Sequence, residues 1–231
     1  MSKRSLFLAS RSDLCYAANM RYAIFSDIHN ETAALSTVLR HAGQQQVDGY
    51  FCLGDVGIDA CVDPVRDVGA PTVFGNWEVS GWRHLSIHNQ PWALKLPPIH
   101  RERGFWLTHA GLAWPTKLPT LAHLNANRHK TPMSELFPYL HYESEALWQT
   151  IAVLTEARVP LMFHGHTHRQ MAWRFTGDNH LQQLGRWPIA LRPGDTLIVG
   201  VGSVGRPIDG PGAAYAIYDD EARQVEMVRV K

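Results

Sequence analysis

Five short apolar runs of this sequence are each followed by side chains that can bind a divalent metal ion. These side chains are carboxylates, an amide and imidazoles, a set that suits Mn, Fe, Zn or Ni without choosing between them. One such residue after one apolar run would have an ordinary structural role, capping or closing a turn. Five repetitions of the same arrangement instead favour one shared metal site. The residues concerned are Asp27, His29, Asp55, Asn76, His109, His166 and His168.

The apolar runs themselves predict the strands that must position these groups. Each run is continuously apolar, as expected for a strand that is buried on both faces of a parallel sheet. In open α/β sheets, ligands collect beyond the carboxyl ends of the strands, so loops far apart in sequence can meet there. The predicted strands are residues 22–25, 50–53, 71–74, 105–107 and 160–163.

Three helices are predicted between these strands. The first spans residues 30–45. It starts at Asn30, which suits an N-cap, and it places Glu31 in a first turn that favours negative charge. Residues 62–68 form a shorter helix, and another begins at about Glu143. The first helix has an approximate apolar stripe made of Ala33, Leu35, Val38, Leu39 and Ala42.

The chain becomes strand-rich from about residue 170. Helix-rich units followed by a strand-rich end predict two sheets within a single domain, residues 20–231. Residues 1–19 show no core-forming pattern, and we expect a disordered extension or an over-long start. The additional strands are predicted at residues 170–175, 196–201, 213–218 and 224–230, separated by turn-prone Gly, Pro and Asp.

Residues 112–148 have little periodicity and hold several prolines, histidines and aromatic residues. Loops of this length in compact domains are usually functional or mobile. Because the segment lies between two ligand-bearing strands, it is predicted to overhang the site. The alternative is a surface loop whose aromatic residues have no role at the site.

Composition narrows the classes of partner. The apolar fraction of 45% supports a sizeable core, and a formal net charge of +1 makes nucleic acid an unexpected partner. No apolar stretch approaches the roughly 20 residues needed to span a bilayer, so no membrane is expected as a partner. The three cysteines, Cys15, Cys52 and Cys61, form no C-x-x-C pair. A reducing, cytoplasmic location is therefore the expectation.

The metal-binding residues also lie in motifs that resemble one known family. Their order and their flanking glycines resemble the calcineurin-like metallophosphoesterases over about residues 21–220. Residues 202–207, G-S-V-G-x-P, resemble the small bacterial and archaeal phosphodiesterase-like branch of that family. The resemblance implies a four-layer α/β/β/α sandwich, with two mixed sheets flanked by helices. The motifs are Asp27-x-His29, Gly54–Asp55, Gly75–Asn76, His109 and Gly165–His166-x-His168.

The resemblance also implies a dinuclear site and a role for each residue. Asp27, His29 and His168 would bind one divalent ion, and Asn76, His109 and His166 the other. Asp55 would bridge the two ions, which could be Mn, Fe, Zn or Ni. A metal-bridging hydroxide would attack phosphorus and hydrolyse a phosphomonoester or phosphodiester. Catalysis would depend on Asp55, Asn76 and His109, and substrate binding on Asn76, Trp77 and Arg206.

Trp77 departs from the family pattern, which often has a histidine after Gly-Asn. A tryptophan cannot protonate a leaving alkoxide, so Trp77 is expected to form an apolar or base-stacking wall, or to belong to the core. His164 either supports the metal ligands from behind or packs against its strand.

Two further functions stay open at this point. One is a non-catalytic interaction scaffold on the same fold, although a scaffold should have lost ligands and all seven are present. The other is a metal-dependent hydrolase of non-phosphate esters. The favoured substrate is a small phosphorylated metabolite or a nucleotide, and the oligomeric state is not predicted.

Overall fold

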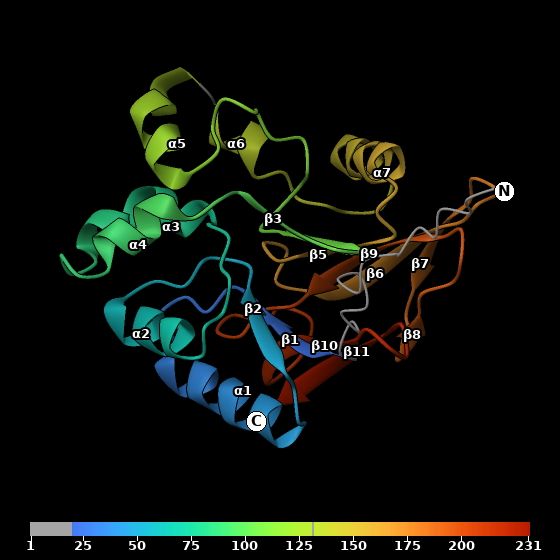
Figure 1. The fold of residues 1–231 in the computed structure, drawn as a ribbon, viewed down its shortest axis with the longest axis horizontal. Coiled ribbons are helices and arrows are strands. Elements are labelled where there is room, and N and C mark those ends of the chain that lie inside the picture. The colour runs from blue at the N-terminus through green and yellow to red at the C-terminus, as the bar shows by residue number, and fades with distance from the viewer. Residues whose placement is uncertain (1–19, 131) are drawn as a thin grey trace, which may run out of the picture.

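Two mixed β-sheets lie face to face in the computed structural model, which describes residues 20–130 and 132–231 (Figure 1). The predicted extension, residues 1–19, lies outside the described residues. The first sheet has the strand order β2-β1-β10-β11-β8, and the second has the order β3-β4-β5-β9-β6-β7. In the first sheet β1 pairs parallel with β2 and antiparallel with β10. In the second, β5 pairs parallel with both β4 and β9.

The strands occupy most of the positions that the apolar runs predict. The first sheet comprises β1 (Arg21–Phe25), β2 (Gly49–Cys52), β8 (Ile189–Ala190), β10 (Ala213–Asp219) and β11 (Gln224–Val230). The second comprises β3 (Ile99–Glu102), β4 (Phe105–Thr108), β5 (Leu161–His164), β6 (Gln170–Phe175), β7 (Leu181–Leu184) and β9 (Thr196–Val201).

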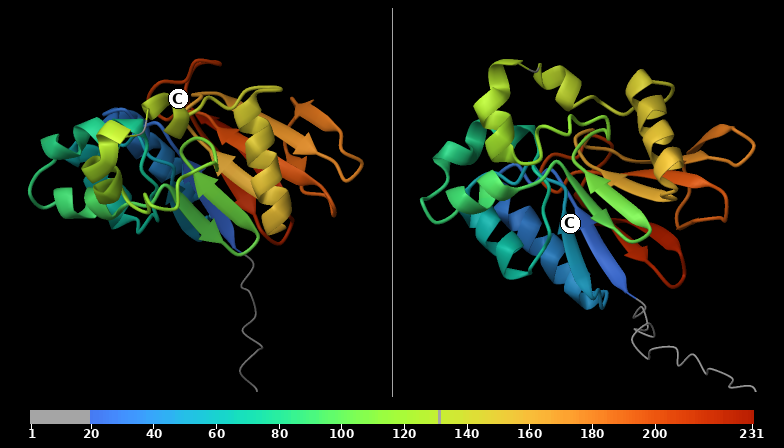
Figure 2. Two further views of the ribbon diagram at one scale, coloured as in Figure 1. Left: turned by 90° about the horizontal axis from the view of Figure 1, so that it is seen from above. Right: turned by 45° about the horizontal axis from the view of Figure 1, so that its top comes forward.

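Helices cover the outer face of each sheet, as Figure 2 shows. None of those in the described residues is long and apolar enough to cross a membrane. The α-helices are α1 (Thr32–Gln44), α2 (Asp59–Asp67), α3 (Asn76–Gly81), α4 (Gln90–Lys95), α5 (Leu121–Asn127), α6 (Met133–Leu136) and α7 (Glu145–Ala157). Short 3-10 helices are η1 (Trp82–His84) and η2 (Arg128–Lys130).

The alternating side chains of the strands divide the core into three apolar layers. On β1, Ala23 and Phe25 pack towards α1 and α2, whereas Ile24 enters the layer between the sheets. On the far side, Met162 of β5 packs with α7. These layers build the four-layer sandwich that the resemblance implies. The middle layer includes Phe51, Leu53, Phe105, Phe163 and Val199.

The first helix begins later than predicted, and Asn30 is not its N-cap. Asn30 has φ 70°, and its Oδ1 accepts a hydrogen bond from the backbone N–H of Ile58 at 3.0 Å. The side chain therefore ties two loops together instead of capping α1, whose N-cap position is Glu31. Of the predicted apolar stripe, Ala33 is exposed and Leu39 is half-buried.

In the described part of the chain, residues 71–74 do not form the predicted strand, because they lack a continuous ladder of backbone hydrogen bonds. This segment forms only one isolated parallel bridge, between Thr72 and Cys52. The N–H of Phe74 then turns away to donate to the carbonyl of Pro97. The apolar run is buried as expected, but it leaves β2 after one bridge.

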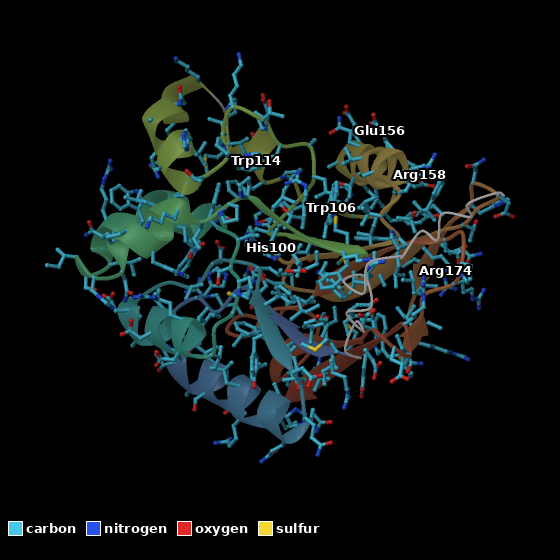
Figure 3. The ribbon with its side chains drawn as sticks, in the orientation of Figure 1. His100, Trp106, Trp114, Glu156, Arg158 and Arg174 are labelled. Atoms are coloured by element: carbon cyan, nitrogen blue, oxygen red, sulfur yellow. The ribbon has the colours of Figure 1, made fainter. Side chains whose placement is uncertain are left out.

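The segment 112–148 contains two short helices, α5 and α6, which its sequence pattern did not predict. Its start is held by Trp114, whose ring lies 5.4 Å from that of Phe74 and 5.6 Å from that of Phe137 (Figure 3). Phe137 is buried, and its ring centroid lies 5.8 Å from that of His109. The segment therefore contacts the predicted site.

Candidate metal centre

The first loop of the site follows β1 and has an unusual backbone. Asp27 and His29 have φ values of 55° and 52°, in the left-handed region that costs most residues about 1–3 kcal/mol. Backbone hydrogen bonds to the loop after β2 hold it there. The N–H groups of Asp27 and His29 donate to the carbonyls of Gly54 and Asp55, each at 3.0 Å.

The same left-handed backbone recurs at other predicted ligands. Asp55, His166 and His168 have φ values of 54°, 64° and 55°. Strained non-glycine residues concentrate at sites where the surrounding structure holds side chains in one arrangement. Here this conformation turns successive side chains of the loops after β1, β2 and β5 into one space.

Two glycines allow these loops to approach one another closely. A Cβ at Gly75 would collide with Asp55 Oδ1, and a Cβ at Gly165 would collide with Ser26 Oγ and approach Asp27 Oδ2 to 2.7 Å. The backbone N–H of His166 uses the freed space to donate to Asp27 Oδ2 at 2.9 Å. The glycines that precede Asn76 and His166 are therefore required by packing.

Hydrogen bonds at Nδ1 orient two of the imidazoles so that their Nε2 atoms point into the cluster. His109 donates its Nδ1–H to the carbonyl of Leu53 at 2.7 Å, and His168 donates to the carbonyl of Arg206 at 2.9 Å. In both rings Nε2 is then the nitrogen left to bind a metal ion. That of His168 lies 3.0 Å from His29 Nε2, and that of His109 lies 3.1 Å from Asn76 Oδ1.

The carboxylates complete a cluster that consists of acceptors. Asp27 Oδ1 has no hydrogen-bond partner within the described residues, and it lies 3.3 Å from His168 Nε2 and 4.0 Å from His109 Nε2. Asp55 extends across the cluster: its Oδ2 lies 3.7 Å from His29 Nε2, and its Oδ1 lies 3.6 Å from His109 Nε2.

Burial and charge shift the pKa values of this cluster in opposite directions. Burial, together with the negative charges of Glu78 and Asp27, raises the pKa of Asp55 well above its usual value. For Asp27, burial opposes ionisation, but the neighbouring imidazoles of His168, His29 and His109 outweigh it and lower the pKa. Burial, with a contribution from His109, lowers the pKa of His166 to about 3, so its imidazole is neutral near pH 7.

Converging buried acceptors with few donors are stable when cations lie between them. Two groups of side chains offer ligand atoms that all lie within 4.8 Å of one another. One is Asp27, His29 and His168, and the other is Asp27, Asp55 and His109. The residues therefore fit two divalent metal ions. The first group matches the predicted trio, and the second places Asp27 near both halves.

The other predicted ligands border the same cluster. The ring of His166 lies 5.0 Å from that of His109, and its Nε2 is buried without a partner among the described residues. Tyr139, from the 112–148 segment, stacks on His166 at 4.3 Å. All seven predicted ligands are thus brought together, and their individual ligand roles stay predictions.

Trp77 and Arg206, predicted to bind substrate, meet at the edge of the cluster. The ring of Trp77 contacts that of His29 edge-on, with centroids 4.2 Å apart. The guanidinium of the exposed Arg206 lies 4.9 Å from the centroid of the Trp77 ring. His164, in contrast, is buried and stacks on Trp173, which agrees with packing against its strand.

Glu78 is an important residue that the sequence prediction missed. Its buried carboxylate accepts hydrogen bonds from the backbone N–H groups of Asp55, Val56 and Gly75 at 2.7–2.8 Å. It therefore joins the second and third ligand loops. The spacing Gly75-x-x-Glu78, in which the glutamate accepts from the N-cap N–H as in one half of a capping box, is a signal visible in the sequence.

The G-S-V-G-x-P segment, residues 202–207, holds the first ligand loop in place through hydrogen bonds. Ser203 Oγ donates to the carbonyl of Asp27 at 2.8 Å, and the N–H of Gly205 donates to the same carbonyl at 3.0 Å. Ser203 Oγ also accepts from the N–H of Arg206 at 2.7 Å. This motif therefore positions both Asp27 and Arg206.

Comparison with known proteins agrees with this arrangement. Residues 20–223 match the model of the calcineurin-like phosphoesterase superfamily domain. An uncharacterized protein of Methanocaldococcus jannaschii is 28% identical over 221 residues, covering 90% of this chain and 86% of that protein.

Two solved structures share the fold. A metallophosphoesterase from Sphaerobacter thermophilus has a TM-score of 0.68 at 24% identity, covering 92% of this chain and 89% of that one. A hypothetical protein from Pyrococcus horikoshii has a TM-score of 0.61 at 11% identity, covering 91% and 88%. At these identities the similarity concerns the fold alone.

Proposed function

Because the chain belongs to the calcineurin-like phosphoesterase superfamily, we propose that it hydrolyses a phosphomonoester or phosphodiester with the help of two divalent metal ions. The observation that carries this proposal is the acceptor cluster, in which Asp55 reaches towards His29 with one oxygen and towards His109 with the other. Such a carboxylate can serve two cations at once. We take the ions to be Mn, Fe, Zn or Ni, with manganese as the first candidate.

Two bound ions would polarise the phosphoryl oxygens and lower the pKa of a water molecule, which supplies the nucleophile. The protein's own part is to hold the ligands in place before substrate arrives. Glu78 and Ser203 fix the loops that carry Asp55 and Asp27. Such preorganisation is typical of groups that stabilise charge developing in a transition state.

Asn76, Trp77 and Arg206 are proposed to bind the substrate. Arg206 is exposed beside the cluster and can donate several N–H groups to phosphate oxygens. Asn76 Oδ1 lies 3.1 Å from His109 Nε2, which keeps its amide within the cluster. Trp77 offers its ring as a wall. A small phosphorylated metabolite or nucleotide fits this set.

The direct test combines metal analysis with a substrate panel. The purified protein, stripped with a chelator and reloaded with Mn²⁺, should hold about two ions per chain and cleave bis(p-nitrophenyl) phosphate or p-nitrophenyl phosphate. Inorganic phosphate should inhibit competitively. Cleavage of p-nitrophenyl acetate instead would indicate the non-phosphate hydrolase. Metal binding without turnover of any ester would favour the interaction scaffold.

A further inference from the structure

A cavity of about 270 Å³ adjoins the metal centre. Its lining includes three tryptophans, Trp77 from α3, Trp82 from η1 and Trp92 from α4. Trp77 is also the residue whose ring contacts His29 at 4.2 Å. One side chain is therefore shared by the cavity and the metal centre. Its other apolar lining residues are Ile58, Val62 and Leu85.

Few polar residues line the cavity, and Trp82, one of the lining residues, has an unpartnered indole N–H among the described residues. The carboxylate of Glu78 is already engaged with the backbone of the ligand loops. The indole Nε1 of Trp82 is buried and has no hydrogen-bond partner within the described residues. A buried N–H without a partner is unfavourable, and an acceptor on a ligand would offset this cost.

Size and shape limit what the cavity can hold. An apolar protein cavity of about 150 Å³ accommodates benzene, so the larger volume here is enough for one flat bicyclic group or a substituted ring. Aromatic side chains prefer stacked or edge-to-face contacts with such groups. Binding sites of this kind combine an apolar wall with a small number of placed polar groups.

We propose that this cavity binds a flat aromatic group of the substrate, one that carries a hydrogen-bond acceptor for Trp82 and is linked to the phosphate held at the metal centre. The inference rests on the proposed phosphoesterase function and extends it to a substrate class. A nucleobase and an aryl alcohol share this chemistry. Trp77 lines the cavity and also contacts His29, so the aromatic group and the phosphate would share this one side chain.

Binding of non-hydrolysable phosphonates tests the cavity without requiring turnover. The Mn²⁺-loaded protein is titrated with methylphosphonate, naphthylmethylphosphonate and quinolinylmethylphosphonate, and with thymidine 5′-phosphate in the presence of a hydrolysis-incompetent metal such as Ca²⁺. We expect at least one aromatic ligand to bind about tenfold or more tightly than methylphosphonate. A preference for thymidine 5′-phosphate would identify a nucleobase, and a preference for the naphthyl or quinolinyl ligand an aryl ester. Equal affinities throughout would overturn the inference.

A glycine in the lining allows the cavity to be filled. Gly81 has φ −90° and ψ −20°, which any residue adopts, and a Cβ there would meet no atom within 4 Å. Gly81→Leu should remove the tenfold preference for the aromatic ligand while leaving methylphosphonate affinity unchanged. The control is Gly185→Leu, at another glycine with open space that lies outside this cavity and should keep the preference. An undiminished preference in Gly81→Leu would place the aromatic group elsewhere.

Trp82→Phe tests the acceptor and does not depend on the folding of the filled variant. It keeps an aromatic wall and removes only the indole N–H. The affinity for the quinolinyl ligand should fall about three- to tenfold, with that for the naphthyl ligand nearly unchanged. Equal effects on both would overturn the role of Trp82. Hydrolysis of methyl p-nitrophenyl phosphate, measured in parallel, reports the proposed function separately: turnover without aromatic preference contradicts only the cavity inference, and aromatic binding without turnover contradicts only the phosphoesterase.

Discussion

The same strands carry two regions: the apolar layer that lies between the sheets, and the metal centre at the strand ends. These regions differ in backbone geometry and in side-chain chemistry. Phe163 in β5 packs against Phe105 at 6.0 Å and Tyr218 at 5.8 Å, in regular strands within a buried hydrophobic cluster. Three residues later, His166 has a left-handed backbone and an unpartnered buried nitrogen among the described residues. The stable sandwich therefore carries a locally strained, charge-dense edge, as expected where side chains are held for function.

Asp55→Asn should have the largest effect and should separate the two regions. Asn keeps the shape and the acceptor for the backbone N–H of Trp77, but it removes the negative charge between the two halves of the cluster. We expect metal content to fall and kcat/KM for the best ester to drop by roughly 10⁴-fold. Metal analysis and steady-state kinetics measure both.

The fold should survive this substitution because the sandwich does not depend on that charge. Without metal, the melting temperature of Asp55→Asn should equal or exceed that of the chelator-treated wild type, since a buried carboxylate close to Glu78 and Asp27 is replaced by a neutral group. Added metal should stabilise the wild type by about 2.7 kcal/mol at 100-fold excess over Kd, and the variant by much less. Near-normal metal content and turnover in the variant would remove the dinuclear interpretation.

Phe163→Ala makes the opposite change, in the layer between the sheets. Truncating a fully buried phenylalanine should lower the free energy of unfolding by about 3–5 kcal/mol. Denaturant unfolding of the metal-free protein measures this loss. The folded fraction should still bind about two metal ions per chain. Loss of metal binding at full folding would mean that the two regions are more tightly coupled than their contacts indicate.

The difference between the regions also explains what the sequence could predict. Strands β6, β9 and β11 occupy the predicted ranges, because apolar and β-branched runs depend on local pattern. β3 was missed, since Ile99–Glu102 is a short edge strand with His, Arg and Glu at three of its positions. The run at 71–74 is apolar and buried, but its pairing ends after one bridge, which no local pattern specifies.

The residues of the candidate site could be predicted from the sequence, but the hydrogen bonds that hold its loops in place could not. The ligand residues could be found because their chemistry and flanking glycines are visible in the sequence. Asn30 illustrates the limit: its side chain was expected to cap α1, yet it bonds to the loop that carries Ile58. Glu78 and Ser203 also bond to backbone groups that lie 22 and 176 residues away, and these contacts are specified only in the folded chain.

Glu78→Gln tests whether a residue that holds the ligand loops affects the site differently from a predicted metal ligand. The amide retains one acceptor oxygen but places an NH₂ group against backbone N–H donors now held by the carboxylate. We expect a loss of about 1–3 kcal/mol in stability, with weaker metal binding but measurable activity. Thermal unfolding and metal titration check this. A variant as inactive as Asp55→Asn, but equally stable, would make Glu78 a direct participant.

Trp77→His is the smallest and most specific change at the boundary of the site. The indole cannot donate a proton to a leaving alkoxide, whereas the backbone N–H of residue 77, which bonds to Asp55 Oδ1 at 2.8 Å, is retained by histidine. Wild type should therefore cleave esters with stable leaving anions, such as p-nitrophenyl phosphates, far faster than alkyl phosphates. General acids contribute about 10²–10⁴-fold, and their absence is felt mainly by poor leaving groups.

A histidine at position 77 should narrow this gap by about tenfold, since a transplanted side chain recovers only part of a general acid's contribution. The measurement is kcat/KM for methyl p-nitrophenyl phosphate and for dimethyl phosphate in both proteins, because the shared methyl ester leaves the leaving group as the only variable. The variant must retain its metal content for the comparison to count. A shallow dependence on the leaving group in wild type would mean that another group, for example Arg206 or a bound water, assists departure. A steep gap left unchanged in a folded, metal-loaded variant would make Trp77 a structural wall of the aromatic cavity, with no part in the departure of the leaving group.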